Sequence, residues 1–184
     1  MVIEKENHFD VVAYNRLATY DSPFNTKAAL FITNFGSGFF LIPAYLTILL
    51  IYLKVRKYRE AMIVGTVASV SLLSGWLLKD LFHRARPTFP FISGAGGYSF
   101  PSGHSLGGFT FSGLLIYLLS KTSVSSYKKW ILSALLFLFS LLIGISRIYL
   151  RVHFASDVLG SLLLTLVWLS LTFILLETIE KNTQ

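Results

Sequence analysis

The side chains that could do chemistry lie in three short segments, and the last of them, residues 146–157, contains a histidine followed by an aspartate. His153 and Asp157 are four residues apart, so in a helix that begins near Val152 they would be neighbours on one face. A carboxylate that accepts a hydrogen bond from one imidazole nitrogen fixes the tautomer and leaves the other nitrogen as a nucleophile. The alternative is a structural His–Asp pair that ties down a helix terminus.

The second segment reads Pro101-Ser102-Gly103-His104 and stands where a glycine-rich stretch becomes apolar. A helix that starts here offers unpaired backbone N–H groups and partial positive charge, and Gly103 lets an anion come close to the backbone. His104, in the first turn, could give or take a proton beside that anion. The alternative is that Ser102 is only a helix cap and His104 only an interfacial polar residue.

The first segment contributes cations just before a proline that stops a helix. Lys79 and Arg86 are seven residues apart, which is two helical turns, so both side chains can point the same way. Such cations also commonly extend to the membrane interface without further function. The third segment adds Arg147. The three segments together thus hold several cations, a helix N-terminus, two histidines and an orienting carboxylate. These groups are suited to the transfer of a tetrahedral oxyanion such as phosphate.

A metal is not required by this set of residues. Asp80 and Asp157 are the only acidic residues between positions 79 and 157, whereas a magnesium site normally uses one or two carboxylates in addition to substrate oxygens. We therefore expect no metal and no other cofactor. A zinc site, opposed by the neighbouring cations, is the alternative, and it would use His83, His104 and His153.

The composition indicates the kind of protein that must position these groups. Hydrophobic residues make up 54% of the chain and charged residues only 14%, with a mean hydropathy of +0.65. This leaves too little polar surface for a soluble domain of this size. Cysteine is absent, which excludes disulfide scaffolds and thiolate chemistry.

Long apolar runs predict an all-α fold, a polytopic bundle of transmembrane helices. A spanning helix needs about 20 apolar residues. One uncharged run, residues 28–53, exceeds a single span, and glycines at positions 36 and 38 divide it. Buried helices of a soluble bundle would show polar faces, which several of these runs lack. The five predicted spans are residues 37–53, 61–78, 102–120, 130–146 and 158–176.

Five crossings place all three polar segments at the same membrane face. The opposite face carries eight basic residues in short loops and in the tail: Lys54, Arg56, Lys57, Arg59, Lys121, Lys128, Lys129 and Lys181. By the positive-inside rule we assign that face to the cytoplasm, because the equally numerous outer cations belong mostly to the polar segments. We thus expect a multi-pass protein of the plasma membrane with its active site on the extracytoplasmic face.

The chain divides into an N-terminal amphipathic segment, residues 1–36, a transmembrane domain, residues 37–177, and a short polar tail, residues 178–184. The N-terminal segment is too charged for a signal peptide and is expected to form a short helix in the membrane interface. The apolar face of this helix would comprise Phe9, Val12, Ala13, Leu17 and Tyr20.

Residues 88–100 form a glycine-rich aromatic loop. This loop is either a connector with interfacial anchors or a lid over the substrate.

These residues resemble the type 2 phosphatidic acid phosphatase family of integral membrane lipid phosphatases. That family has the motifs K-x6-R-P, P-S-G-H and S-R-x5-H-x3-D, and all three are present in order. They stand here as Lys79, Arg86 and Pro87, then Pro101, Ser102, Gly103 and His104, then Ser146, Arg147, His153 and Asp157. Members usually have six spans, whereas this sequence shows five and no hydrophobic first helix.

The resemblance implies a catalytic mechanism. His153 would attack phosphorus and form a phosphohistidine, Asp157 would orient it, and His104 would protonate the leaving group and then activate water. The phosphate would be bound by Lys79, Arg86, Ser102, Gly103 and Arg147.

The expected function is hydrolysis of a lipid phosphomonoester or pyrophosphate, without a metal. Candidate substrates are phosphatidylglycerophosphate, phosphatidate and a polyprenyl pyrophosphate, and the expected partners are this lipid and membrane lipids, with no nucleic acid. A lipid phosphotransferase or a non-enzymatic lipid-binding protein on the same scaffold are the alternatives. A vanadium-dependent haloperoxidase resembles the same motifs, but those relatives are soluble.

Overall fold

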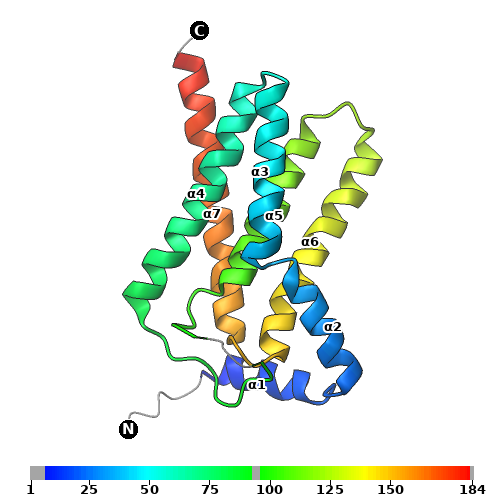
Figure 1. Ribbon diagram of the computed structural model, residues 1–184, viewed down its shortest axis with the longest axis vertical. Coiled ribbons are helices and arrows are strands. Elements are labelled where there is room, and N and C mark those ends of the chain that lie inside the picture. Colours follow the sequence, from blue (N-terminus) through cyan, green and yellow to red (C-terminus); the bar gives the residue numbers. More distant parts are fainter. Residues whose placement is uncertain (1–6, 93–95, 183–184) are drawn as a thin grey trace.

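The structure, a computed structural model, describes residues 7–92 and 96–182, and every regular element in those residues is helical (Figure 1). The all-α prediction is therefore confirmed. The helices are α1 (His8–Ala18), α2 (Pro23–Asn34), α3 (Gly38–Lys54), α4 (Tyr58–Phe82), α5 (Gly103–Ser120), α6 (Ser126–Tyr149) and α7 (Ala155–Asn182).

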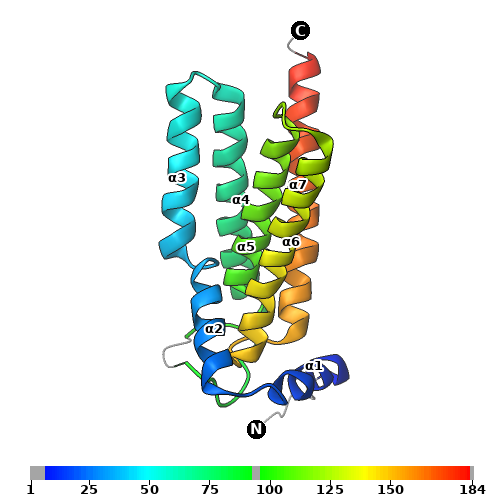
Figure 2. The same cartoon turned by 90° about the vertical axis from the view of Figure 1, so that its right-hand side faces the viewer.

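Helices α3 to α7 form an elongated bundle, and each coincides with one of the five predicted spans (Figures 1 and 2). In the described residues, four helical stretches are long and apolar enough to cross a membrane: Pro23–Lys54, Tyr58–Phe82, Ser126–Tyr149 and Ala155–Leu175. The first of these joins α2 and α3, whose boundary lies at the predicted glycine break. The remaining predicted span, α5, falls short of this criterion because small and polar residues interrupt its apolar sequence.

α5 lies at the centre of the bundle, where it packs against α3, α4, α6 and α7. Its hydroxyl groups bond to its neighbours: Thr110 Oγ1 is 3.3 Å from Ser71 Oγ of α4 and 3.2 Å from Thr165 Oγ1 of α7. Leu114, one turn further along, is fully buried among aliphatic residues. Interhelical hydrogen bonds and close packing take the place of the hydrophobic effect within a bilayer. α5 therefore tolerates polar residues because protein, and not lipid, surrounds it.

The turn between α2 and α3 packs directly against the start of α5. A Cβ atom at Gly36 would lie 2.7 Å from the His104 carbonyl oxygen and 2.7 Å from Ile143 Cγ2. Only glycine permits this approach without displacing one of the neighbours. The glycine break thus does more than separate two helices, because it lets the turn support the N-terminus of α5.

α1 runs across one end of the bundle, roughly perpendicular to its long axis (Figure 2). The predicted N-terminal helix is present, and the expected apolar face is turned largely outward: Phe9 and Val12 are each about half exposed. The residue of α1 that is buried is Asp10. The predicted turn before α2 is also present, and the Tyr149 hydroxyl lies 3.1 to 3.4 Å from polar atoms of Asp21, Ser22 and Thr26.

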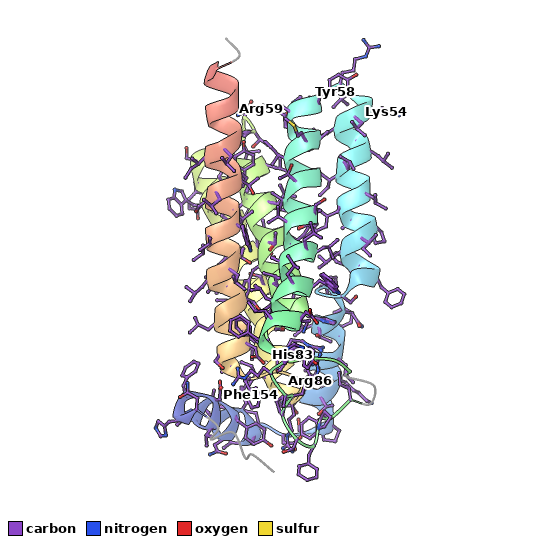
Figure 3. All side chains as sticks on the ribbon, turned by 90° about the vertical axis from the view of Figure 1, so that its left-hand side faces the viewer. Lys54, Tyr58, Arg59, His83, Arg86 and Phe154 are labelled. Atoms are coloured by element: carbon purple, nitrogen blue, oxygen red, sulfur yellow. The ribbon has the colours of Figure 1, made fainter. Side chains whose placement is uncertain are left out.

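The two ends of the bundle differ in chemistry. The α3–α4 turn, with Lys54 and Arg59, lies at one end, and His83, Arg86 and Phe154 lie at the other (Figure 3). All three polar segments are therefore at the end where α1 and α2 pack. The sequence predicts this arrangement, because five consecutive membrane crossings put the three polar segments on the same side.

Candidate active site

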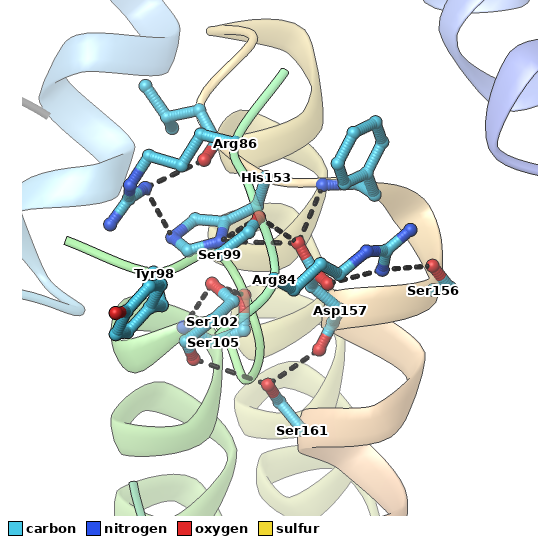
Figure 4. A network of polar contacts seen from close by, with 12 residues as sticks. Arg84, Arg86, Tyr98, Ser99, Ser102, Ser105, His153, Ser156, Asp157 and Ser161 are labelled. Carbon is cyan, nitrogen blue, oxygen red and sulfur yellow. Dashed lines mark hydrogen bonds and ion pairs between the residues drawn. The ribbon is translucent and has the colours of Figure 1, made fainter. Parts of the chain in front are cut away.

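The C-terminal ends of α4 and α6, the N-terminal ends of α5 and α7 and the loop after α4 form a polar cluster, part of which Figure 4 shows. Lys79 lies in the last turn of α4 and Arg147 in the last turn of α6. His153 lies in the turn between α6 and α7, and Asp157 lies in the first turn of α7. The expected site residues are thus brought together from distant parts of the sequence, and Arg86 follows α4 in the loop that closes the cluster.

His153 and Asp157 are in contact, although the helix does not start where the spacing suggested. α7 begins at Ala155 and not near Val152, so His153 precedes the helix. His153 Nδ1 nevertheless lies 3.5 Å from Asp157 Oδ2. The same carboxylate oxygen accepts hydrogen bonds from the Phe154 backbone N–H, at 2.9 Å, and from the Ser99 hydroxyl. Asp157 therefore holds the turn that carries the histidine, as a helix-capping carboxylate does.

The other imidazole nitrogen faces a guanidinium group. Arg86 Nη1 lies 3.2 Å from His153 Nε2 and 2.7 Å from the Val152 carbonyl oxygen, to which it donates. Arginine offers only donors, so this contact requires Nε2 to be the acceptor and places the ring proton on Nδ1, toward Asp157. This is the tautomer that leaves Nε2 with a lone pair directed into the cluster.

His153 is 3% exposed, and its surroundings disfavour protonation. Burial lowers the pKa of His153 to about 4, the charges of Arg86 and Arg147 act in the same direction, and the hydrogen bond to Asp157 opposes them. The imidazole is consequently neutral at physiological pH, the form in which it is a nucleophile.

Among the residues that the structure describes, Arg147 and Lys79 of the cluster have no carboxylate as an ion-pair partner. Arg147 is 5% exposed and donates from Nη1 to Thr33 Oγ1 at 2.8 Å. Its Nε is buried and has no hydrogen-bond partner among the described residues. Lys79 Nζ donates to the Tyr98 carbonyl oxygen at 2.7 Å. A buried guanidinium with an unpaired N–H costs free energy unless an anion occupies the site, so this geometry is suited to an oxyanion ligand.

Ser102 caps the N-terminus of α5, which is one of the two roles expected for it. It is fully buried, and its Oγ accepts a hydrogen bond from Ser105 N at 3.4 Å and lies 2.8 Å from Ser105 Oγ. Gly103 and His104 line an adjacent cavity. The N-terminus of α5 thereby faces the cluster, with Ser102 holding the helix start.

The glycine-rich loop is fastened to the site by its backbone. The Gly96 and Gly97 carbonyl oxygens each accept a hydrogen bond from Arg86 at 3.0 Å, and Tyr98 binds Lys79 as described. Ser99 N donates to the Arg84 carbonyl oxygen at 2.7 Å. Within the described part of the loop, which omits residues 93–95, the backbone thus orients two of the expected phosphate-binding cations.

Two cavities adjoin the cluster. The larger, of about 400 Å³, extends between α3, α4 and α5 from Lys79, Gly103 and His104 to apolar residues such as Leu41. The smaller, of about 180 Å³, lies between α1 and the turn that carries His153. The first combines a cationic end with an apolar body and therefore matches the shape of a lipid with a charged headgroup.

The zinc alternative is not supported by the geometry. The described residues contain no group of three or more His, Cys, Asp or Glu side chains arranged to hold a metal ion. His83 is more than half exposed, stacks edge-on against Tyr98 and lies 3.9 Å from Asp80. The three histidines of this region are thus not assembled around one point.

Comparison with known proteins identifies the family. Residues 59–181 match the PAP2 superfamily. The chain belongs to this family. A related PAP2 protein, phosphatidylglycerophosphatase B of Bacillus subtilis, is 34% identical over 140 residues, which cover 74% of this chain and 68% of the relative. An undecaprenyl-diphosphatase of Sulfolobus acidocaldarius is 28% identical over 174 residues, covering 92% of this chain and 77% of that protein.

Solved structures agree with this PAP2 assignment. The transmembrane PAP2-type phosphatidylglycerolphosphate phosphatase of Bacillus subtilis superimposes with a TM-score of 0.78 at 27% identity, covering 95% of this chain and 86% of that one. LpxE of Aquifex aeolicus shares the fold at 24% identity, with a TM-score of 0.70 and coverage of 94% and 99%. The chain is thus a multi-pass membrane protein, and the expected enzyme class, a hydrolase of phosphoric ester or diphosphate bonds, is confirmed.

Three residues of the cluster were not expected to belong to it. Arg84 donates to Asp157 Oδ1 at 2.6 Å and to Asp10 Oδ2 at 2.8 Å, and Ser99 binds the other oxygen of Asp157. Burial alone would lower the pKa of Arg84, but its hydrogen bonds and ion pairs with both carboxylates raise it. Arg84 and Ser99 lie close in sequence to the motifs, which is a weak signal. Asp10 lies outside the PAP2 match, and nothing in the sequence marks it.

Proposed function

We propose that this PAP2 protein is a metal-independent lipid phosphatase that acts through a phosphohistidine at His153. The observation that carries the proposal is the position of His153 Nε2, which is neutral, lies 3.2 Å from Arg86 and belongs to a cluster with unpaired positive charge. An apolar cavity opens from the same cluster. Nucleophile, charge stabilisation and space for a lipid chain therefore coincide.

In the first step, His153 Nε2 forms a bond to phosphorus while the bond from phosphorus to the lipid oxygen breaks. Lys79, Arg86 and Arg147 bind the phosphoryl oxygens, whose charge is spread in the transition state. Asp157 accepts a hydrogen bond from His153 Nδ1–H and stabilises the positive charge that develops on the imidazole ring. The unpaired Nε of Arg147 gains its partner in this complex.

His104 is placed to serve the leaving group. It lines the larger cavity together with Lys79 and Gly103, so it lies on the side where the lipid chain would enter. There its imidazolium form donates a proton to the departing lipid oxygen and becomes the neutral imidazole. In the second step, the same imidazole accepts a proton from water as the water oxygen attacks phosphorus and the bond to His153 Nε2 breaks, which releases inorganic phosphate.

The apolar residues that line the larger cavity support a lipid substrate. Its residues between α3 and α4 include Ile42, Leu72 and Trp76, all more than half exposed and therefore available to lipid at the bundle surface. With relatives named phosphatidylglycerophosphatase and undecaprenyl-diphosphatase, the proposed substrates are phosphatidylglycerophosphate, phosphatidate or a polyprenyl pyrophosphate. We place residues 1–36 at the interface and assign residues 37–177 to the transmembrane domain. Of the expected tail, residues 178–184, the first five continue α7 as a helix. Residues 1–6 and 183–184 lie outside the described residues. We assign the site to the extracytoplasmic face.

The test is release of inorganic phosphate by the purified protein in detergent, with the three lipid classes and soluble phosphate esters as substrates. We expect lipids to be preferred and activity to persist in EDTA. His153→Ala should lose at least about a thousandfold in kcat, since removal of a nucleophile is among the costliest substitutions. Retention of more than about a hundredth of the rate would rule out the phosphohistidine, and EDTA inactivation reversed by added metal would rule out the metal-independent step.

A further inference from the structure

A buried carboxylate from outside the PAP2 match reaches the catalytic cluster. Asp10, in the first turn of α1, is 3% exposed although the helix itself lies at the surface. Its Oδ1 accepts from Ser156 N at 2.8 Å, and its Oδ2 accepts from Ser156 Oγ at 2.7 Å and from Arg84 Nη2 at 2.8 Å. A carboxylate is buried at such a site only when donors satisfy it in this way.

Arg84 connects this carboxylate to the catalytic pair. Its Nη2 donates to Asp10. Its Nη1 donates to Asp157 Oδ1 at 2.6 Å and to Ser156 Oγ at 2.7 Å, and Figure 4 shows these two contacts. The guanidinium carbon lies 4.2 Å above the ring of Phe154, which fixes the plane of the fork. One planar cation thus bridges two carboxylates, a geometry that lysine cannot reproduce.

The two carboxylate oxygens of Asp157 contact different groups. Oδ1 faces Arg84, and Oδ2 faces His153 together with two further donors. If Arg84 had no second carboxylate, its whole charge would act on Asp157 and would weaken the interaction of Asp157 with the imidazole proton. Asp10 shares that charge and anchors the guanidinium from the other side.

We propose that Asp10 and Arg84 are positioning residues, through which α1 holds Asp157 in place against His153. The inference rests on the proposed function, because it concerns the same catalytic pair. Neither residue is among those assigned to the phosphate, so both should affect the rate of the chemical step and not substrate binding. A purely structural role of α1 would instead lower stability and leave the turnover of folded protein unchanged.

Asp10→Asn tests the proposal, with Asp80→Asn as the matched control. Both substitutions remove one negative charge at the same end of the bundle, and the Asp80 side chain is 73% exposed. For folded, purified protein we expect Asp10→Asn to lower kcat about tenfold or more, as loss of an outer hydrogen-bonding partner commonly does, with KM within about twofold of wild type. Asp80→Asn should behave as wild type.

A double-mutant cycle separates positioning from other effects. If Asp10 acts through Asp157, then Asp10→Asn should cause little further loss in an Asp157→Asn background. Equal fractional losses in both backgrounds, or a kcat for Asp10→Asn equal to that of Asp80→Asn, would overturn the inference. Where Asp10→Asn does not fold, Arg84→Lys preserves every charge, cannot bridge both carboxylates and should show the same loss and the same dependence on Asp157.

Phosphate release by the wild type distinguishes failure of the positioning role from failure of the proposed function. An active wild type with a fully active Asp10→Asn variant overturns the positioning role alone. A wild type that releases no phosphate from any lipid overturns the proposed function.

Discussion

At the scale of residues, the proposed chemistry depends on how few carboxylates among the described residues pair with the cations of the cluster. Asp157 is engaged by Arg84, Ser99 and the Phe154 N–H, so it neutralises little of the charge on Arg147. A phosphoryl group would bring the missing negative charge. The free energy spent on holding these cations together is recovered when substrate binds, which favours the transition state over the empty site.

The protonation of His153 gives a direct test of this environment. Because burial lowers its pKa to about 4 from an ordinary value near 6.5, the ring should stay neutral down to about pH 5 and be half protonated near pH 4. The unfolded chain binds the proton more readily, so this group reduces stability as the pH falls below about 6.5. Nitrogen-15 NMR of labelled histidines, with His153→Ala to identify the signal, measures the titration, and a midpoint above 6 would contradict it.

Arg147 should affect stability and activity in opposite directions. Arg147→Met removes a buried guanidinium that has an unpaired Nε, so we expect a higher Tm in detergent. The same substitution should lower kcat/KM by about a thousandfold or more, since a phosphate-binding arginine commonly contributes that much. Inorganic phosphate or vanadate should raise the Tm of wild type and not that of the variant. An unchanged kcat/KM would remove Arg147 from the phosphate site.

At the scale of elements, the start of α5 is held by the turn between α2 and α3. The sequence indicates that a break occurs at the glycines, but it does not show that this turn touches His104. The contact arises from packing between segments about seventy residues apart, which local patterns do not encode. Gly36 therefore links the N-terminal part of the chain to His104, for which we propose a catalytic role.

Gly36→Ala should damage both folding and catalysis. The new Cβ would lie 2.7 Å from the His104 carbonyl oxygen, so we expect a loss of about 1–3 kcal/mol in stability and a lower kcat. Gly65→Ala in α4 is the matched control, because a Cβ there meets nothing within 4 Å and should be neutral or slightly stabilising. Thermal unfolding in detergent and phosphate release measure the two effects, and equal behaviour of the two variants would contradict the packing argument.

Much of the bundle could be predicted because membrane spans follow from local hydropathy. The helices α3, α4, α6 and α7 each contain a long uncharged apolar run. The motif residues meet because successive helices from α3 to α7 alternate in direction, which brings the three motifs to one end of the bundle. Arg84 and Asp10 could not be predicted, since their roles depend on where α1 packs. Hydropathy also could not show that Phe9 and Val12 of α1 are exposed while its aspartate is buried.

At the scale of the whole molecule, both ends of the bundle carry basic residues, but those at the site end belong mostly to the polar segments. The eight basic residues assigned to the cytoplasm lie in the loops and tail away from the site, and the α3–α4 turn is visible at that end in Figure 3. Short basic loops remain on the cytoplasmic side during insertion. The active site would then meet lipids of the outer leaflet.

Cysteine labelling tests this orientation, since the chain contains no cysteine of its own. Phe89→Cys places a thiol in the exposed loop beside the site, and Ser123→Cys places one in the turn between α5 and α6. In intact cells, a membrane-impermeant maleimide should label the first variant and not the second, while both should react after permeabilisation. The reverse pattern would place the active site in the cytoplasm.

The hydroxyl contacts of α5 also bear on how the protein is made. In the growing chain α5 emerges before α6 and α7, and until α7 arrives Thr110 lacks its partner Thr165. A helix that contains glycines and hydroxyl groups without all of their hydrogen-bond partners partitions poorly from the translocon into lipid. We therefore expect α5 to leave the translocon only together with the two helices that follow it, so that biogenesis is completed at the C-terminal end of the chain.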